Sequence, residues 1–238
     1  MRDKIEKFKQ LVKNSNNIVF FGGAGVSTES GIPDFRSKDG LYNQRYKYLP
    51  EEILSYTFFI NNTEEFYKFY KEKMNFLKYE PNITHIKLSE LEKQGKLKAV
   101  ITQNIDGLHQ KAGNKNVLEL HGSVLRNYCV NCNKFYEAEF IFNEEGIPKC
   151  SCGGIIKPDV VLYEERLDDV ILSNSINAIQ NADLMIVAGT SLTVSPASDL
   201  VNFYKGSKLV LINKDSTPYD KVANLLINES LGKVFEEI

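Results

Sequence analysis

The stretch Ile18-Val-Phe-Phe-Gly-Gly-Ala-Gly25 decides the fold of this chain of 238 residues. Its four consecutive apolar residues are typical of a strand that is buried on both faces of a sheet. The glycines directly after them predict a tight turn into a helix, which is how an α/β nucleotide-binding fold begins. The turn is either a phosphate cradle or a plain strand-to-helix turn, because the fingerprint G-x-G-x-x-G fails at Thr28.

The rest of the chain repeats this arrangement of strands and helices. An amphipathic helix is predicted over residues 4–13, before the first strand. Residues 184–213 contain a strand, a helix and a second strand, and this spacing implies a parallel sheet with helices on both faces. The predicted strands are 18–21, 97–102, 117–120, 184–188 and 208–213, with a helix around 196–204 between the last two.

The composition is that of an ordinary globular protein, with 42% apolar and 25% charged residues. A formal net charge of −2 argues against a general attraction to nucleic acid. No run approaches the roughly 20 apolar residues that span a bilayer, and residues 1–10 lack the apolar core of a signal peptide. We therefore expect a cytoplasmic protein without a membrane or nucleic-acid partner, in which cysteines are metal ligands or free thiols.

The four cysteines form two close pairs, Cys129-Val-Asn-Cys132 and Cys150-Ser-Cys152, with 17 residues between them. Two such pairs joined by a hairpin suit tetrahedral coordination of zinc. Four sulfur ligands leave no coordination position open, so the metal would be structural. The alternative is four unrelated buried thiols. The second pair is C-x-C rather than the commoner C-x-x-C, so its turn must differ.

Two stretches interrupt the alternation of strands and helices. Residues 33–82 are polar, rich in aromatic side chains and helical in pattern, and residues 126–157 contain all four cysteines. We interpret both as insertions that pack together. The predicted fold is α/β, a Rossmann-like parallel-sheet domain with a smaller inserted helical and zinc-ribbon domain. The predicted boundaries are 1–32, 83–125 and 158–238 for the larger domain and 33–82 and 126–157 for the smaller one.

Small and polar residues follow several of the predicted strands. His121 comes directly after one strand, where the ligand-binding groups of an α/β sheet gather, although a lone histidine is more often structural. Gly189-Thr-Ser191 supplies a second loop of small residues after another strand. Asn213 stands 24 residues after Gly189, where a dinucleotide fold reads the ribose, and Asp215 follows it. Two such loops at the carboxyl ends of parallel strands suit a dinucleotide.

Taken in this order, these segments resemble the sirtuins, a family of NAD-dependent protein deacylases. The resemblance is to sirtuins of the bacterial type. The resemblance covers nearly the whole chain. The matching segments are 23–27, 31–36, 102–109, 121–122, the two cysteine pairs, 157–161, 189–192 and the strand that ends at Asn213.

The resemblance implies a cleft between the two domains for NAD+, as cosubstrate, and an acylated lysine of a protein or peptide, beside a structural Zn2+. The acyl oxygen would attack the anomeric carbon of the nicotinamide ribose and expel nicotinamide. His121 would then act as the general base that takes a proton from the ribose hydroxyls. Water would release free lysine and O-acyl-ADP-ribose.

The resemblance also assigns roles by position. Asp106 and the backbone of Ile105 would bind the nicotinamide carboxamide, while Asn104 would hold ribose and the attacking water. Phe35 and Arg36 would belong to a loop that closes over the cofactor. The other residues implied in NAD binding are Gly23, Ala24, Gly25, Gln103, Gly189, Ser191, Asn213 and Asp215.

The substrate peptide would pair with the backbone of Val160 and Val161 as an added strand. The next residues are Leu162-Tyr-Glu-Glu165, where many sirtuins have a glycine before the glutamate. Members that remove succinyl or malonyl groups carry a Tyr-x-x-Arg pair. Its nearest counterpart here is Tyr70-Lys-Glu-Lys73, so removal of acidic acyl groups is a secondary expectation.

Other classes of function stay open at this point. Mono-ADP-ribosyl transfer or lipoamide removal would start from the same cleft. A non-enzymatic module, with a zinc ribbon beside a nucleotide-sensing domain, is the third reading. The near-neutral charge and the polar loop of residues 103–106 argue against that reading.

Overall fold

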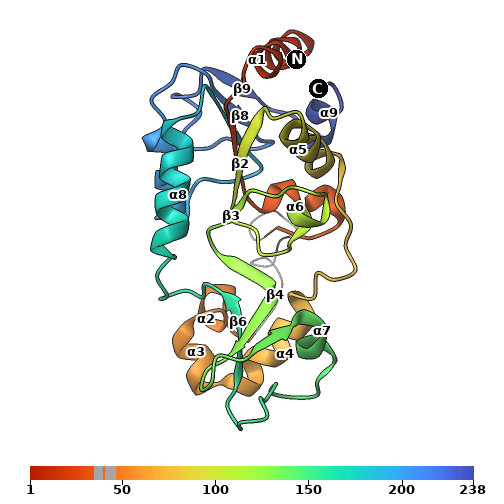
Figure 1. The fold of residues 1–238 in the computed structure, drawn as a ribbon, viewed down its shortest axis with the longest axis vertical. Coiled ribbons are helices and arrows are strands. Elements are labelled where there is room, and N and C mark those ends of the chain that lie inside the picture. The colour runs from red at the N-terminus through yellow and green to blue at the C-terminus, as the bar shows by residue number, and fades with distance from the viewer. Residues whose placement is uncertain (35–39, 41–46) are drawn as a thin grey trace.

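The computed structural model describes residues 1–34, residue 40 and residues 47–238. The predicted cofactor residues Phe35 and Arg36 lie outside the described residues. Figure 1 shows an elongated molecule whose larger part carries both termini at one end, while a smaller part lies at the other end.

The larger part is built on a six-stranded sheet in the order β3-β2-β1-β7-β8-β9, in which every neighbouring pair is parallel. The predicted strands are confirmed, with ends that differ by at most one residue. The short edge strand β9 was not predicted. The strands are β1 (Ile18–Gly22), β2 (Leu97–Thr102), β3 (Val117–Glu119), β7 (Leu184–Ala188), β8 (Leu209–Ile212) and β9 (Leu225–Ile227).

Helices cover both faces of this sheet, as predicted. Ile18 and Phe20 of β1 pack on one face against α1 (Arg2–Lys13), α5 (Ile83–Lys93) and α9 (Leu231–Phe235). Val19 and Phe21 face the opposite core, which α8 (Asp169–Gln180) and η4 (Ala197–Phe203) complete. Because alternate side chains of a strand point to opposite faces, the apolar run of β1 is buried on both sides.

Two predicted helices take a different form. The glycine turn after β1 leads into two short 3-10 turns, η1 (Ala24–Val26) and η2 (Thr28–Ser30), instead of an α-helix. The predicted helix around 196–204 is the 3-10 helix η4. In the first case Gly31, with φ +92°, ends the second turn in a left-handed conformation that stops helix growth.

The smaller part holds the antiparallel sheet β5-β4-β6, formed by β4 (Gly122–Cys129), β5 (Phe135–Glu137) and β6 (Ile156–Val160). Residues of both predicted insertions share its core, in which the rings of Phe66 and Tyr70 stack 5.6 Å apart. The strands β4 and β6 run across the predicted boundaries at 125 and 158, and the division into domains stays a prediction. The helices are α2 (Pro50–Ile53), α3 (Tyr56–Asn61), α4 (Thr63–Lys73) and α7 (Ala138–Asn143).

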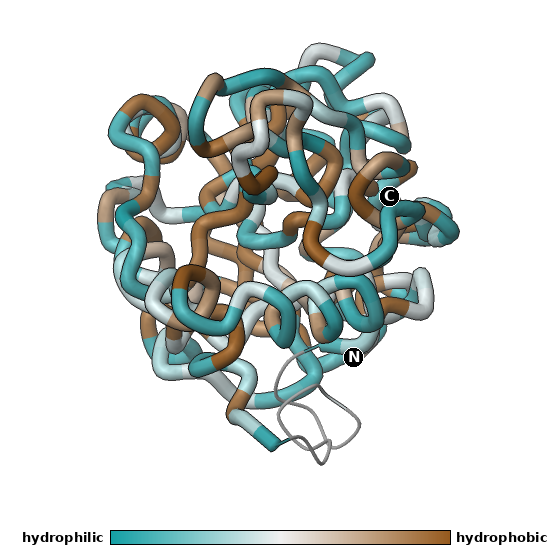
Figure 2. The backbone as a smooth tube through the Cα atoms, turned by 90° about the horizontal axis from the view of Figure 1, so that it is seen from below, coloured by the Kyte–Doolittle hydropathy of each residue, from teal (hydrophilic) through white to brown (hydrophobic). Residues whose placement is uncertain are grey.

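Hydrophobic segments gather inside the molecule and hydrophilic ones lie at its periphery, as Figure 2 shows from below. In the described part of the chain, none of the helices has the length and apolar character that crossing a membrane requires.

Candidate active site

A cleft of about 450 Å³ lies at the carboxyl edge of the parallel sheet, where it meets the smaller part. It brings together segments that follow different strands of the sheet, at the point where the strand order reverses between β1 and β7. Every predicted NAD, catalytic and peptide residue that the structure describes lines it: Gly23, Ala24, Gly25, Gln103, Asn104, Ile105, Asp106, His121, Val160, Val161, Gly189, Ser191, Asn213 and Asp215.

The two glycine loops pack against each other, backbone to backbone. The amide of Gly25 donates a 2.8 Å hydrogen bond to the carbonyl of Gly189, whose φ is +58°. A Cβ atom on Gly25 would stand only 2.8 Å from the Cα and carbonyl oxygen of Gly189. Only glycine allows this approach, and it leaves the loops after β1 and β7 side by side at the cleft, as the sequence predicted.

A chain of hydrogen bonds orders the loop after β2. The Asn104 side chain donates to Ser27 Oγ at 3.0 Å, and Ser27 Oγ donates to the Asp106 carboxylate at 2.7 Å. The other carboxylate oxygen accepts the backbone amide of Leu108 at 2.9 Å. Burial raises the pKa of Asp106, and these hydrogen bonds oppose the rise. The loop therefore presents a fixed set of donors and acceptors to the cleft.

His121 follows β3 and its ring is held by the backbone. Its Nδ1 lies 2.9 Å from the carbonyl oxygen of Gln103. Because a carbonyl oxygen only accepts hydrogen bonds, Nδ1 carries the proton and Nε2 keeps a lone pair. Burial lowers the pKa of His121, and the bond to Gln103 partly offsets this. The ring is therefore neutral near pH 7, with a proton acceptor at Nε2.

The backbone of His121 and Gly122 contacts the segment around Val160 and Val161, where the substrate peptide is predicted to pair. The carbonyl of His121 accepts the amide of Val161 at 3.0 Å. Gly122 has φ +73°, and a Cβ on it would lie 1.9 Å from the carbonyl oxygen of Asp159. The close contact of β4 with β6 at this point thus requires glycine directly after the histidine.

Thr190 links Gln103 to Asn213 at the edge of the cleft, and the sequence analysis did not name it as a site residue. Its hydroxyl accepts the side-chain amide of Gln103 at 3.0 Å, and its carbonyl accepts that of Asn213 at 3.3 Å. Asn213 also donates to the carbonyl of Asp215 at 3.1 Å. The residues after β2, β7 and β8 therefore form one connected edge.

Ser27, Met74 and Phe76 also line the cleft, and the sequence analysis did not name them as site residues. Ser27 stood inside the matching segment 23–27, and its hydroxyl was the available signal. Tyr70 and Lys73 of α4 line the cleft together with Met74 and Phe76. The Tyr70 hydroxyl is buried and has no hydrogen-bond partner among the described residues. The helical insertion thus supplies one wall of the cleft.

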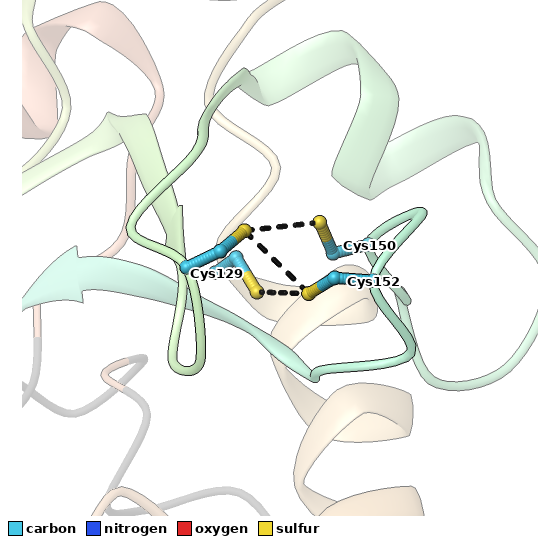
Figure 3. A group of neighbouring side chains, drawn as sticks. Cys129, Cys150 and Cys152 are labelled. Atoms are coloured by element: carbon cyan, nitrogen blue, oxygen red, sulfur yellow. Dashed lines mark hydrogen bonds between the residues drawn. The ribbon is translucent and has the colours of Figure 1, made fainter.

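The four cysteines form one cluster, in which the Sγ atoms all lie within 4.8 Å of one another. The Sγ–Sγ distances are 3.4 Å for Cys129–Cys152, 3.6 Å for Cys132–Cys150 and 3.5 Å for Cys132–Cys152. These distances exceed a disulfide bond and approach the roughly 3.8 Å between sulfurs of a tetrahedral zinc site. Figure 3 shows the sulfur atoms turned toward one another, and the donor set fits structural zinc.

The glycines after the second pair explain how a C-x-C turn completes this cluster. Gly153 has φ +84°, and the amide of Cys150 donates to the carbonyl of Gly154 at 2.8 Å. A Cβ on Gly154 would stand 2.8 Å from Cys129 Sγ. The Gly-Gly sequence therefore lets the shorter turn bring both sulfurs to the first pair.

The other two histidines lie on α5 and on α6 (Leu108–Lys111), and neither is among the described residues that line the cleft. The rings of His85 and His109 lie 4.7 Å apart, and both residues are buried. Burial lowers the pKa of His85 to about 4, and it lowers that of His109 well below the ordinary value, with His85 adding to the effect. Both rings are therefore neutral near pH 7.

Comparison with known proteins identifies relatives over the whole chain. A model of the Sir2 family matches residues 23–196. The chain is 59% identical to the NAD-dependent protein deacetylase of Clostridium perfringens, over 100% of this chain and 99% of that protein. It is 47% identical to the protein of the same name from Cutibacterium acnes, over 98% of this chain and 96% of that protein.

Solved structures show the same similarity. A Sir2 complex with p53 peptide and NAD+ matches with a TM-score of 0.87 and 40% identity, over 98% of this chain and 95% of that one. A Sir2 complex with an inhibitor, 2'-O-acetyl-ADP-ribose and deacetylated p53 peptide matches with a TM-score of 0.86 and 39% identity, over 97% and 96%.

Proposed function

The chain belongs to the Sir2 family, and we propose that it removes acyl groups from protein lysine side chains with NAD+ as cosubstrate. The observation that carries the proposal is His121 Nε2, an unprotonated acceptor in a cleft that also contains the two glycine loops and a peptide edge. The relatives named NAD-dependent protein deacetylase and the Sir2 complexes with NAD+ and peptide support it.

We propose that the dinucleotide lies along the edge formed after β1, β7 and β8. Backbone amides at the start of a glycine turn suit a diphosphate, and the amide and carbonyl groups near Asn213 suit the adenosine ribose. Phe35 and Arg36 complete the cofactor site in this proposal. The contributing residues are Gly23, Ala24, Gly25, Gly189, Ser191, Asn213 and Asp215.

At the other end, the loop after β2 holds the nicotinamide and its ribose. The Asp106 carboxylate and the backbone of Ile105 face the carboxamide, and Gln103 and Asn104 face ribose hydroxyls and water. Because Ser27 fixes the Asp106 side chain before any ligand arrives, no reorganisation is required on binding.

The proposed reaction consumes the acyl-lysine, NAD+ and water. The acyl oxygen bonds to the anomeric carbon of the nicotinamide ribose as the bond to nicotinamide breaks. His121 Nε2 then accepts a proton from the ribose hydroxyls, which lets the 2'-oxygen attack the acyl carbon. Nicotinamide has left in the first step, and water then adds to the acyl carbon and releases free lysine and O-acyl-ADP-ribose. Asn104 orients the water in this proposal.

The cysteine cluster holds zinc as a structural ion, and it contributes no step. Four thiolates close the coordination sphere, and Cys129 and Cys150 belong to the core of the smaller part. A cytoplasmic location is part of the proposal, because reduced thiols that bind metal persist in a reducing compartment.

The acyl preference has a second candidate. Tyr70 and Lys73 line the same cleft, so a succinyl or malonyl carboxylate entering it would meet a hydroxyl and an ammonium group. Acetyl removal is the first proposal, since the named relatives are deacetylases.

The proposed deacylase activity and its acyl preference can be tested together. The assay measures nicotinamide release from acetylated, succinylated and long-chain acylated peptides of one sequence. We expect the acetylated peptide to be turned over fastest and His121→Ala to abolish turnover. Transfer of ADP-ribose to protein, with no turnover of any acylated peptide, would overturn the proposal in favour of a mono-ADP-ribosyltransferase.

A further inference from the structure

Residues 160–165, which we name the peptide strap, begin at the end of β6 and are hydrogen-bonded to the segment of α2 and α3 in the smaller part. The Val161 amide donates to the carbonyl of His121, and the Tyr163 amide donates to the carbonyl of Leu54, each at 3.0 Å. The Tyr56 amide in turn donates to the carbonyl of Tyr163 at 3.0 Å. The strap thus spans the cleft between the proposed base and α2–α3.

The side chain of Lys157 is hydrogen-bonded to both ends of the strap. Its Nζ donates to the carbonyl of Val160 at 3.0 Å, to the carbonyl of Pro158 at 3.4 Å and to Glu165 Oε2 at 2.9 Å. An ammonium group has three N–H donors, so these three acceptors use all of them. Only 19% of the Lys157 side chain is exposed, so the charge is partly withdrawn from water.

Glu165 closes the strap at its other end. The oxygen that accepts Lys157 also accepts the amide of Leu162 at 2.8 Å, and the amide of Glu165 donates to the carbonyl of Leu162 at 3.0 Å. The Glu165 side chain is 26% exposed. Lys157 therefore binds both ends of the strap, the carbonyl of Val160 at its start and the carboxylate of Glu165 at its end, and fixes the turn between them.

Glu164 adds a third attachment. It has φ +77°, a left-handed conformation that a glutamate rarely adopts, and its carboxylate accepts the amide of Thr57 at 2.9 Å. The strap is thus tied to β4, to the helices and to itself, and its backbone has one defined course.

These contacts separate the strap from the proposed NAD edge. The bonds that order the cofactor loops join residues after β1, β2, β7 and β8, and none of them involves Lys157 or Glu165. Among the described residues, the imidazole of His121 is hydrogen-bonded to Gln103, whereas the strap is hydrogen-bonded to the backbone carbonyl of His121. A change in the ion pair should therefore affect peptide binding at Val160 and Val161 more than it affects NAD+ binding.

We propose that Lys157 and Glu165 are positioning residues that hold the peptide strap in the conformation that pairs with the acylated peptide. The pair sets the affinity for the peptide and leaves NAD+ binding and the chemical step largely unchanged. The inference rests on the proposed function, in which the peptide adds a strand at Val160 and Val161.

Steady-state kinetics of the full chain, with acetylated peptide and NAD+ varied in turn, test this. Lys157→Met removes the ammonium group and keeps an apolar stem. We expect it to raise the KM for peptide about tenfold, the loss of roughly one charge-assisted hydrogen bond, while kcat and the KM for NAD+ change less than about twofold. Lys157→Arg, which keeps charge and donors, should restore most of the peptide affinity.

The matched control is Lys233→Met, which breaks an ion pair with Glu229 at the surface and should leave all constants at wild-type values. Glu165→Gln keeps an acceptor for Leu162 and decides the question if Lys157→Met does not fold. A folded variant with unchanged peptide KM, or with peptide and NAD+ constants that rise together, would overturn the inference.

Binding of a fluorescent acetyl-lysine peptide, measured by anisotropy without turnover, separates this inference from the proposed reaction. If the wild-type chain binds the peptide but releases no nicotinamide, the proposed function fails. In that case the strap inference stands only if Lys157→Met weakens binding, and equal binding by the two chains would refute it.

Discussion

The Nδ1 atom of His121 lies 2.9 Å from the carbonyl oxygen of Gln103, and this bond decides which ring nitrogen can accept a proton. The two residues are 18 positions apart in the sequence and follow neighbouring strands, β3 and β2. The bond places the proton of the neutral ring on Nδ1 and leaves Nε2 unprotonated, so that Nε2 can act as the base.

The pH dependence of the reaction should follow the neutral form of His121. Burial lowers the pKa of His121 below its ordinary 6.5, although the bond to Gln103 partly offsets this. Since the base works unprotonated, kcat/KM should be constant near pH 7 to 8 and fall as the pH drops through a midpoint below 6.5. A midpoint above pH 7 would contradict the assignment, as would a loss of less than about 100-fold in His121→Ala.

Substitution of Gly25 should weaken NAD+ binding selectively. In Gly25→Ala the new Cβ meets the Gly189 backbone at 2.8 Å, so the two loops must move apart. We expect the KM for NAD+ to rise about tenfold or more, because small displacements at a binding edge are costly, while peptide binding persists. Gly146→Ala is the control: a Cβ there has no neighbour within 4 Å, and the strain of an alanine at φ +64° falls on an exposed residue that does not line the cleft. Equal NAD+ constants in both variants would show that the loops do not hold the cofactor.

The cysteine cluster should contain one zinc ion per chain, detectable by elemental analysis. Cys152→Ala should lose the metal and melt at a lower temperature, because removal of one ligand opens a site on which the core of the smaller part depends. Ser151→Ala, between two ligands, is the matched control and should keep both. Zinc content that survives in Cys152→Ala, or melting insensitive to chelators, would argue against the site.

Acid should destabilise the fold through the buried pair of histidines. The pKa of His85 is lowered from 6.5 to about 4, so between these values the unfolded chain takes up a proton that the folded chain refuses. The His85 ring therefore leaves the free energy of unfolding unchanged above pH 6.5 and lowers it by about 3 kcal/mol as the pH drops toward 4.

The variant His85→Gln tests the origin of this acid sensitivity. His85 Nδ1 accepts the amide of Asn82 at the start of α5, a role that glutamine also fills at this position. Urea unfolding at several pH values gives the free energy of unfolding as a function of pH. Between pH 6.5 and 4 this free energy should fall less steeply with decreasing pH in the variant than in the wild-type chain. The same slope in both chains would assign the sensitivity to other groups, His109 among them.

Much of the fold could be read from the sequence because its signals are local. The run of residues 18–21 is a buried strand wherever it packs, and the glycines after it can only form a turn. The spacing of the cysteine pairs likewise predicted their cluster. The short strand β9 and the 3-10 form of residues 197–203 were not predicted, because packing against neighbouring elements decides them.

The sequence by itself determined the parallel sheet, the cysteine ligands and the family resemblance, since each depends on residue type at short spacing. Only the tertiary structure decided which polar groups meet. Ser27 and Asp106 are 79 residues apart, and Lys157 reaches Glu165 across a turn whose course depends on β4 and α3. A lone histidine has no defined role until folding gives one nitrogen a carbonyl partner and leaves the other unprotonated. For His121 that partner is Gln103, and the fold brings the two together at the carboxyl edge of the sheet.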